Sequence, residues 1–352
     1  MKTSSVVAAS ARFGRRTVVA ALAATAVVTV AIEAAESAPP SAVPADKVWL
    51  LGDPPQPADN LTTPARVELG KALFFDPRIS GNGTVSCASC HNPSLGWSDG
   101  LRTGVGINGT VLGRATPTVV NTAYNTQFMW DGRKKSLEDQ ALGPMKTPEE
   151  MKTDFSAALA MLNGIPAYRD MFNAAYPGEA VSEETMAKAI AAFERTVVSK
   201  DSRFDRWVAG DRNAINPQEY RGYKLFMAAD KGNCAACHKP PNFTDNGYHN
   251  IGIADQGDAG RFKIRAVAVL KGAFKTPTLR DIELTAPYFH NGSAQTLDEV
   301  VEHYALGGVE RSNLSPDVRK LDLNAQEKAD IVAFMRTLTA PIKTASLPAL
   351  PQ

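Results

Sequence analysis

The sequence predicts a mostly α-helical protein made of two related halves in tandem, with long loops rich in glycine and proline. A Cys-x-x-Cys-His motif occurs twice, at residues 87–91 and 234–238. A similar glycine-containing segment precedes each motif, at residues 69–74 and 221–226. Apolar residues recur at helical spacing in several stretches, and long apolar-polar alternation typical of strands is absent.

Each Cys-x-x-Cys-His motif is the signature of a covalently attached c-type haem, because two thiols bond the porphyrin and the adjoining imidazole coordinates the iron. A four-thiolate zinc site, redox disulfides and structural disulfides are the alternatives, but none accounts for a histidine directly after both pairs. We therefore expect two tandem cytochrome c-like haem domains with two covalently bound haem c. The residues concerned are Cys87, Cys90, His91, Cys234, Cys237 and His238.

Composition and charge limit the class of protein. Of 352 residues, 44% are hydrophobic and 21% charged, which is typical of a globular chain with enough apolar residues for two cores. The formal net charge is +1 and no basic stripe is present, so neither nucleic acid nor an anionic membrane surface is an implied partner.

Residues 1–38 have the order of a secretory signal peptide. Basic residues up to position 16 precede an apolar run from Val18 to Ile32, and small residues follow up to Ala38, after which we expect cleavage. Export to the periplasm agrees with the haem prediction, because c-type haem is attached outside the cytoplasm. An uncleaved anchor is the alternative. No other stretch approaches the length of a membrane span, so the mature form should not be membrane-embedded.

The remaining chain divides by composition and by the repeat. Residues 39–63 are rich in proline and are expected to form a linker or an extended arm. Residues 64–212 should form the N-terminal haem domain and residues 213–342 the C-terminal haem domain. Residues 343–352 form a tail.

Local signals place several helix ends. Pro64 and Pro217 are expected at the first position of a helix. Ser182 precedes an apolar helical pattern, and Asn324 with Glu327 resembles a capping box that opens a last helix.

The first haem iron is expected to be open on its distal side. No histidine occurs between His91 and His238, so a second imidazole would have to come from the other half of the chain. An open ferric haem is a reactive site, whereas a haem with two strong protein ligands carries electrons. A distal methionine is the alternative, for which the candidates are Met129, Met145 and Met151.

Several segments resemble the bacterial dihaem cytochrome c peroxidase and MauG family. They are Trp130-Asp131-Gly132-Arg133, Gln140-Ala141, Glu150-Met151, Phe274-Lys275-Thr276-Pro277-Thr278-Leu279-Arg280 and Thr285-Ala286-Pro287-Tyr288-Phe289-His290-Asn291-Gly292. The resemblance runs from about residue 64 to residue 338. It implies peroxide chemistry at the first haem, so that residues 64–212 would be the peroxidatic domain and residues 213–342 the electron-transfer domain.

The resemblance implies roles for three residues of the first half. Glu150 takes the place of the distal carboxylate, Gln140 that of a pocket amide, and Trp130 that of an indole between the haems. Peroxide cleavage needs a group that takes a proton from one oxygen and returns it to the departing one. Without the resemblance, Glu150 would be interpreted as a solvated acid and Trp130 as a core residue.

The loop after the first motif departs from the peroxidase branch, many members of which carry a distal histidine there. Residues 92–114 contain no histidine. We therefore expect an enzyme that needs no reductive activation.

The second haem is expected to have Tyr304 as its distal ligand. Thr296 and Glu299 resemble a capping box, and the apolar residues after it place Tyr304 on the buried face of a helix. MauG has a tyrosine at this place and the peroxidase branch a methionine. A phenolate stabilises high iron oxidation states, which favours the MauG behaviour. A core tyrosine is the alternative, with Met227, Met335, His249, His290 and His303 as substitute ligands.

The family also holds a calcium ion between its haems. Thr285 and Pro287 match the positions that supply carbonyl oxygens. Ala115 stands where the family has an asparagine, so one side-chain oxygen is missing from a cation that needs about six.

The preferred interpretation is a periplasmic dihaem peroxidase that reduces hydrogen peroxide with electrons from a small c-type cytochrome or cupredoxin. The alternative is a MauG-like enzyme that oxidises residues of a protein substrate. A dihaem electron carrier without peroxide chemistry is a third interpretation, which requires strong ligands on both faces of both irons.

Overall fold

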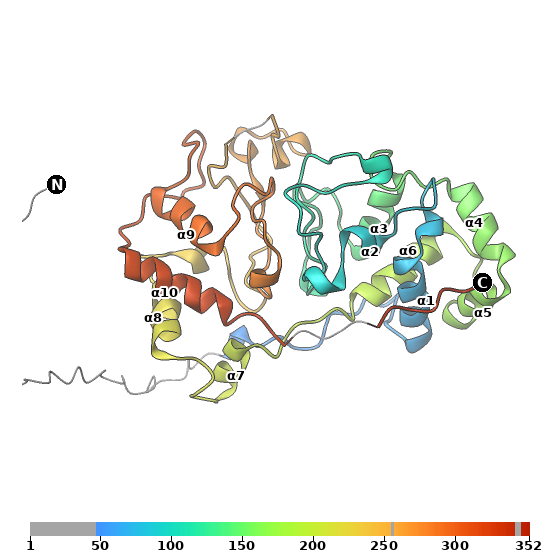
Figure 1. The fold of residues 1–352 in the computed structure, drawn as a ribbon, viewed down its shortest axis with the longest axis horizontal. Coiled ribbons are helices and arrows are strands. Elements are labelled where there is room, and N and C mark those ends of the chain that lie inside the picture. Colours follow the sequence, from blue (N-terminus) through green and yellow to red (C-terminus); the bar gives the residue numbers. More distant parts are fainter. Residues whose placement is uncertain (1–46, 255–256, 342–345) are drawn as a thin grey trace, which may run out of the picture. The chain divides into compact units, whose positions relative to one another are not determined.

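The computed structural model describes residues 47–254, 257–341 and 346–352, and the predicted signal peptide lies outside them (Figure 1). Within these residues the helices are α1 (Pro64–Phe75), α2 (Cys87–Cys90), α3 (Leu137–Lys146), α4 (Phe155–Gly164), α5 (Pro166–Ala175), α6 (Glu183–Glu194), α7 (Arg203–Ala209), α8 (Pro217–Met227), α9 (Leu297–Leu306) and α10 (Ala325–Arg336). Two short strands, β1 (Tyr248–His249) and β2 (Phe274–Lys275), pair antiparallel. The mostly helical fold is confirmed. No helix among the described residues is both long enough and apolar enough to cross a membrane.

The N-terminal half is built on the crossing of α1 and α6, whose side chains share one buried core. At the crossing, a Cβ atom added to Gly70 would lie 1.9 Å from the carbonyl oxygen of Ala189. Only glycine allows two helices to approach so closely.

The C-terminal half repeats this arrangement with α8 and α10. A Cβ atom on Gly222 would lie 1.9 Å from the carbonyl oxygen of Asp330. The internal repeat in the sequence is therefore a repeated helix crossing, in which the glycine is followed four residues later by a buried phenylalanine, Phe74 or Phe226. The predicted domain boundary falls in the turn between α7 and α8, and it stays a prediction.

Most of the predicted helix starts are confirmed. Pro64 and Pro217 are the first residues of α1 and α8. The side chain of Ser182 caps α6, and Asn324 and Glu327 form a reciprocal capping box at the start of α10.

The start of α9 differs in one detail from the predicted capping box. The hydroxyl of Thr296 accepts the backbone N–H of Glu299 at 3.1 Å, as expected. The carboxylate of Glu299, however, accepts the backbone N–H of Gln295 at 2.6 Å. The reciprocal bond is made one residue earlier than predicted, because the side chain is long enough to reach it.

The described part of the proline-rich stretch forms an extended arm that packs on both halves. Trp49 is buried against Phe243 in the C-terminal core, and its carbonyl oxygen accepts a hydrogen bond from Arg280 at 2.8 Å. Arg280 also forms a buried ion pair with Asp205 at 2.9 Å. Asn60 is buried in the N-terminal half and donates to the carbonyl oxygen of Lys188.

The close helix crossing predicts the effect of a single added methyl group. Gly222→Ala is expected to lower the free energy of unfolding by about 1–3 kcal/mol, because α8 must move away from α10. Thermal and denaturant unfolding measure the effect. Gly164→Ala is the matched control, since nothing lies within 4 Å of its added Cβ atom. Equal stability of the two variants would contradict the role assigned to the crossing.

Candidate active site

Each Cys-x-x-Cys-His motif lies in the wall of its own cavity. The first cavity has a volume of about 1260 Å³ and is lined by Cys87, Cys90 and His91. The second, of about 280 Å³, is lined by Cys234, Cys237 and His238, although its lining also reaches His91. The two motifs are thus brought to separate cavities that adjoin each other.

The two motif histidines are held in the same way. Nδ1 of His91 lies 3.2 Å from the carbonyl oxygen of Trp97, and Nδ1 of His238 lies 2.9 Å from that of Phe243. This contact leaves Nε2 as the nitrogen available to a metal. Burial lowers the pKa of both imidazoles, to about 4 for His238, and so favours the neutral form that coordinates iron. The residues present fit a haem in each cavity.

The alternatives for the cysteines do not fit. The four thiols form no disulfide. Burial raises the pKa of the Cys87 and Cys234 thiols, whereas a redox-active Cys-x-x-Cys pair needs a lowered one. Among the described residues, the one group able to hold a metal ion is Cys237 with Asp245 and His249, which contains a single thiol. No four-thiolate zinc site is formed in this part of the chain.

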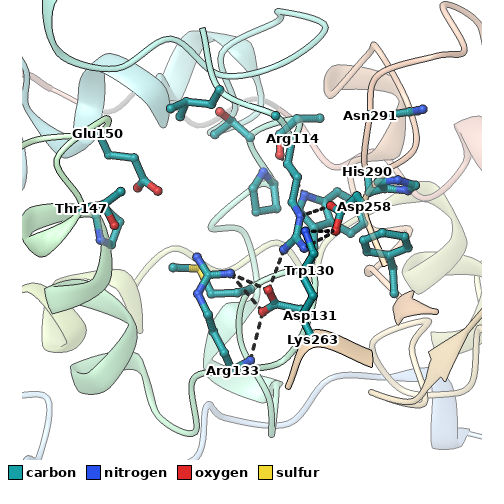
Figure 2. A pocket seen from close by; sticks show the side chains of 18 of the residues that line it. Arg114, Trp130, Asp131, Arg133, Thr147, Glu150, Asp258, Lys263, His290 and Asn291 are labelled. Carbon is teal, nitrogen blue, oxygen red and sulfur yellow. Dashed lines mark hydrogen bonds and ion pairs between the residues drawn. The ribbon is translucent and has the colours of Figure 1, made fainter. Parts of the chain in front are cut away.

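Gln140 and Glu150 line the first cavity together with His91. Gln140 lies on α3, and Glu150 lies in the turn after it, where its carbonyl oxygen accepts the backbone N–H of Ile107 at 2.7 Å. The carboxylate of Glu150 points into the cavity, across from His290 (Figure 2). Burial raises the pKa of Glu150, and the nearby positive charge of Arg133 offsets this only in part. A carboxyl group whose protonated form is favoured in this way can both take up and return a proton.

Other candidate ligands also lie near the first cavity. Met129 and Met151 line it, whereas Met145 is buried in the core of the N-terminal half. His290 comes from the C-terminal half, and its ring stacks on Phe274 with a centroid distance of 3.6 Å. An imidazole from the other half therefore reaches this wall, held by an aromatic stack.

Trp130 lines both cavities. Its indole N–H donates to the carbonyl oxygen of Ala115 at 2.8 Å, and its ring meets that of His290 edge to face at 6.4 Å. The backbone N–H of Lys275 donates to the carbonyl oxygen of Trp130 at 2.8 Å. The indole is fixed from both halves of the chain at the place where the two cavities meet.

An ion-pair network, shown in Figure 2, lies beside Trp130. Asp131 accepts from Arg114 at 2.8 Å and from Arg133 at 2.9 Å. Arg114 also contacts Asp258 at 2.6 Å, and Asp258 contacts Lys263 at 3.1 Å. Burial alone would raise the pKa of Asp131, but the bonds from the arginines outweigh it and lower the pKa. These residues link both halves. Asp131 and Arg133 belong to a segment that carries the family resemblance, but nothing in the sequence indicated that they form a network with Arg114 and Asp258.

Tyr304 lines the second cavity. Burial raises the pKa of its phenol, so a phenolate there requires a compensating positive charge such as that of an iron. His303 points elsewhere, with Nε2 2.8 Å from the carbonyl oxygen of Ile251. Of the substitute ligands, Met335, His249 and His290 also line this cavity, whereas Met227 is exposed.

The comparisons with known proteins agree with this geometry. Residues 64–213 match the family described as di-haem cytochrome c peroxidase. The methylamine utilization protein MauG of Methylorubrum extorquens is 44% identical over 300 residues, 84% of each chain. The cytochrome c551 peroxidase of Nitrosomonas europaea is 37% identical over 311 residues, 86% of this chain and 89% of that protein. The chain belongs to the dihaem cytochrome c peroxidase and MauG family.

A solved structure from the same family gives the same fold. The crystal structure of a MauG-like protein associated with microbial copper homeostasis matches with a TM-score of 0.78 at 33% identity, over 83% of this chain and 94% of that one. Membership of the dihaem peroxidase and MauG family implies haem cofactors and an oxidoreductase of the haem peroxidase type. Relatives carry both names, so the peroxidase and MauG interpretations both lie within this family.

The residues predicted as calcium ligands lie around the second cavity. Thr285 and Pro287 line it, and Ala115 lines both cavities. The carbonyl oxygen of Ala115 already accepts the indole N–H of Trp130. Residue 115 is an alanine and offers no side-chain oxygen to the predicted calcium site.

Glu194, at the end of α6, is a residue of the first cavity that the sequence reasoning missed. It is 4% exposed, lines both cavities, and its Oε2 atom has no hydrogen-bond partner. Burial raises its pKa to about 8, although Arg195 beside it acts in the opposite direction. The available signal was an acid four residues after Ile190, on the apolar face of a predicted helix.

The raised pKa of Glu194 predicts a pH-dependent stability. The folded protein favours the protonated form of this carboxyl group. Below about pH 4.5 the group therefore does not destabilise the fold, and between about pH 4.5 and 8 the free energy of unfolding falls as the pH rises. Glu194→Gln should therefore stabilise the protein relative to wild type by a few kcal/mol at pH 8, and little at pH 5. Denaturant unfolding at both pH values measures this. The exposed carboxylate of Glu184 provides the control variant Glu184→Gln, and a pH-independent effect at position 194 would refute the assignment.

Proposed function

We propose that this protein reduces hydrogen peroxide to water at the first cavity, with electrons from a small redox protein. The observation that carries the proposal is the lining of one cavity by His91, Glu150 and Gln140. Two haem c groups, attached through the cysteines of the two motifs, are part of the proposal. A haem held by His91, Cys87 and Cys90 would supply an iron able to take up the oxidising equivalents of peroxide.

Glu150 is the proposed proton carrier. Its raised pKa allows it to accept a proton from one peroxide oxygen and to return it to the oxygen that leaves, so that water leaves rather than hydroxide. Gln140 supplies an amide in the same wall, where it can orient peroxide through hydrogen bonds. Apolar residues such as Ala141 and Ile190 line the same cavity.

Trp130 is the proposed path for electrons between the haems. Its indole lines both cavities, and its N–H bond to Ala115 fixes the plane of the ring. A ring held in this way needs little rearrangement when charge passes through it. His238 and its cysteines would hold the haem that stores the second oxidising equivalent.

A MauG-like oxidation of a protein substrate is the second candidate, because Tyr304 lines the second cavity. As a distal ligand its phenolate would stabilise a high oxidation state in that cavity rather than attract electrons at high potential. Hydrogen peroxide is the oxidant in both candidates, and they differ in who supplies the electrons.

Two further parts of the proposal concern compartment and calcium. The predicted signal peptide, residues 1–38, supports a periplasmic location. The carbonyl oxygens of Thr285 and Pro287 are proposed calcium ligands, with water in place of the oxygen that Ala115 lacks.

The decisive experiment mixes the purified diferric protein with peroxide, without prior reduction, and follows its absorption spectrum. We expect a reaction in the first mixing, because residues 92–114 supply no histidine to block the first site. Rapid turnover only with a reduced small cytochrome or cupredoxin supports the peroxidase. A long-lived product oxidised above the diferric level supports the MauG-like enzyme. A low-spin protein that does not react with peroxide would support the third interpretation, an electron carrier.

Replacement of the proposed proton carrier should slow the reaction with peroxide. Glu150→Gln is expected to lower the rate constant roughly 100-fold or more, because the amide accepts no proton. The wild-type rate should also rise with pH through the raised pKa of Glu150, and the variant should lack this rise. Stopped-flow spectroscopy measures both. The matched control is Glu179→Gln, an exposed carboxylate of the same half. Unchanged rates in Glu150→Gln would exclude the role.

A further inference from the structure

The loop between α8 and α9 exposes an unusual surface. Residues 263–269 are seven consecutive exposed residues. Three of them are large apolar residues: Ile264 is 46% exposed, Val267 39% and Val269 63%. Exposed apolar side chains gathered in one segment typically mark an interaction surface. Basic side chains, Lys263, Arg265 and Lys271, lie among and beside them. We call residues 263–271 the docking loop.

The docking loop forms one side of the first cavity's mouth. Ile264, Ala268 and Lys271 line that cavity, and so does Val111, which is 71% exposed. Asn313, which also lines the cavity, donates hydrogen bonds to the carbonyl oxygens of Ala268 and Lys271 of the docking loop. The exposed apolar surface is therefore continuous with the entrance to the proposed peroxide site.

Arg261, two residues before the docking loop, contacts the segment that carries Trp130. Arg261 donates to the carbonyl oxygens of Asp131 and Gly132 at 2.8 and 2.7 Å, and it covers the ring of Tyr248. Lys263, at the start of the loop, reaches Asp258 of the ion-pair network. Arg261 thus connects the chain next to the docking loop with the segment that carries Trp130.

The charge of the docking loop indicates which kind of protein could bind to it. Arg265 and Lys271 are exposed cations of the loop, and its sequence contains no acidic residue. A second copy of this chain bound symmetrically would bring these cations against one another, which opposes association. A partner with acidic residues around an apolar face would complement the loop instead. Apolar contact within a charged rim also suits the brief encounters of electron-transfer proteins.

We propose that the docking loop binds an acidic redox protein, a small cytochrome or cupredoxin with an apolar face, which delivers electrons to the Trp130 segment. This inference rests on the proposed peroxidase function and names its partner by charge. Each partner molecule loses one electron, so two of them, with two protons, reduce one peroxide to two waters.

The test reverses the charge of the docking loop in the holoprotein. Arg265→Glu with Lys271→Glu should raise the Kd and the KM for an acidic cupredoxin about tenfold, which corresponds to about 1.4 kcal/mol. The KM should rise steeply with salt in wild type and hardly in the variant. The matched control is Lys47→Glu with Arg212→Glu, two exposed cations outside the loop. Val269→Asp tests the apolar contact without removing a cation.

Separate measurements distinguish failure of docking from failure of the proposed function. Calorimetric binding of the oxidised cupredoxin reports on the docking loop alone, and turnover with a small artificial electron donor reports on peroxide chemistry alone. Equal Kd values for the docking-loop and control variants, tighter binding of a basic cytochrome c, or a dimer in sedimentation that Val269→Asp dissociates would each overturn the docking proposal. Intact binding with no turnover of peroxide by any donor would overturn the function instead.

Discussion

The structure depends on the way both halves of the chain hold the segment that carries Trp130. The indole bonds to Ala115 in its own half, while the backbone of residues 130–132 accepts hydrogen bonds from Lys275 and Arg261 of the other half. These bonds are made to carbonyl groups, so they fix the position of the segment whatever its side chains do. The two cavities meet at this segment, and their relative placement follows from it.

Glu150 and Glu194 line the first cavity, and their different surroundings change how readily each carboxyl group can ionise. Burial raises the pKa of both Glu150 and Glu194. Glu150 sits in a turn with Arg133 nearby and reaches the cavity from an irregular segment, so it can change its charge at moderate cost. Glu194 ends a helix, is 4% exposed and has a carboxylate oxygen without a hydrogen-bond partner, so its ionised form is far more costly. The first suits proton transfer, and the second suits a group that stays neutral.

Structural features that depend on a short stretch of sequence could be predicted. The two haem motifs, the capping of α6 and α10, and the prolines that open α1 and α8 depend only on neighbouring residues. The placement of Tyr304 rather than His303 toward the second cavity followed from the rotation of about 100° between successive helical residues. Contacts between distant segments could not be predicted. Arg114 and Asp258 are 144 positions apart, and no periodicity joins them.

The same limit applies to the assigned roles. Glu150 and Gln140 were selected by resemblance, because a single acid in a turn carries no signal of its own. The structure places them in one cavity with His91, which is the information that spacing along the chain does not contain. Glu194 was passed over because an acid at a helix end normally faces solvent.

The burial of Trp49 has a consequence for the order of assembly. Its indole packs on Phe243, and its carbonyl oxygen is held by Arg280, which lies more than two hundred residues later. In a chain synthesised from the N-terminus, the segment that carries Trp49 cannot form these contacts until the second half has been synthesised and has folded. The environment of this one tryptophan therefore reports whether the whole polypeptide has reached its finished state.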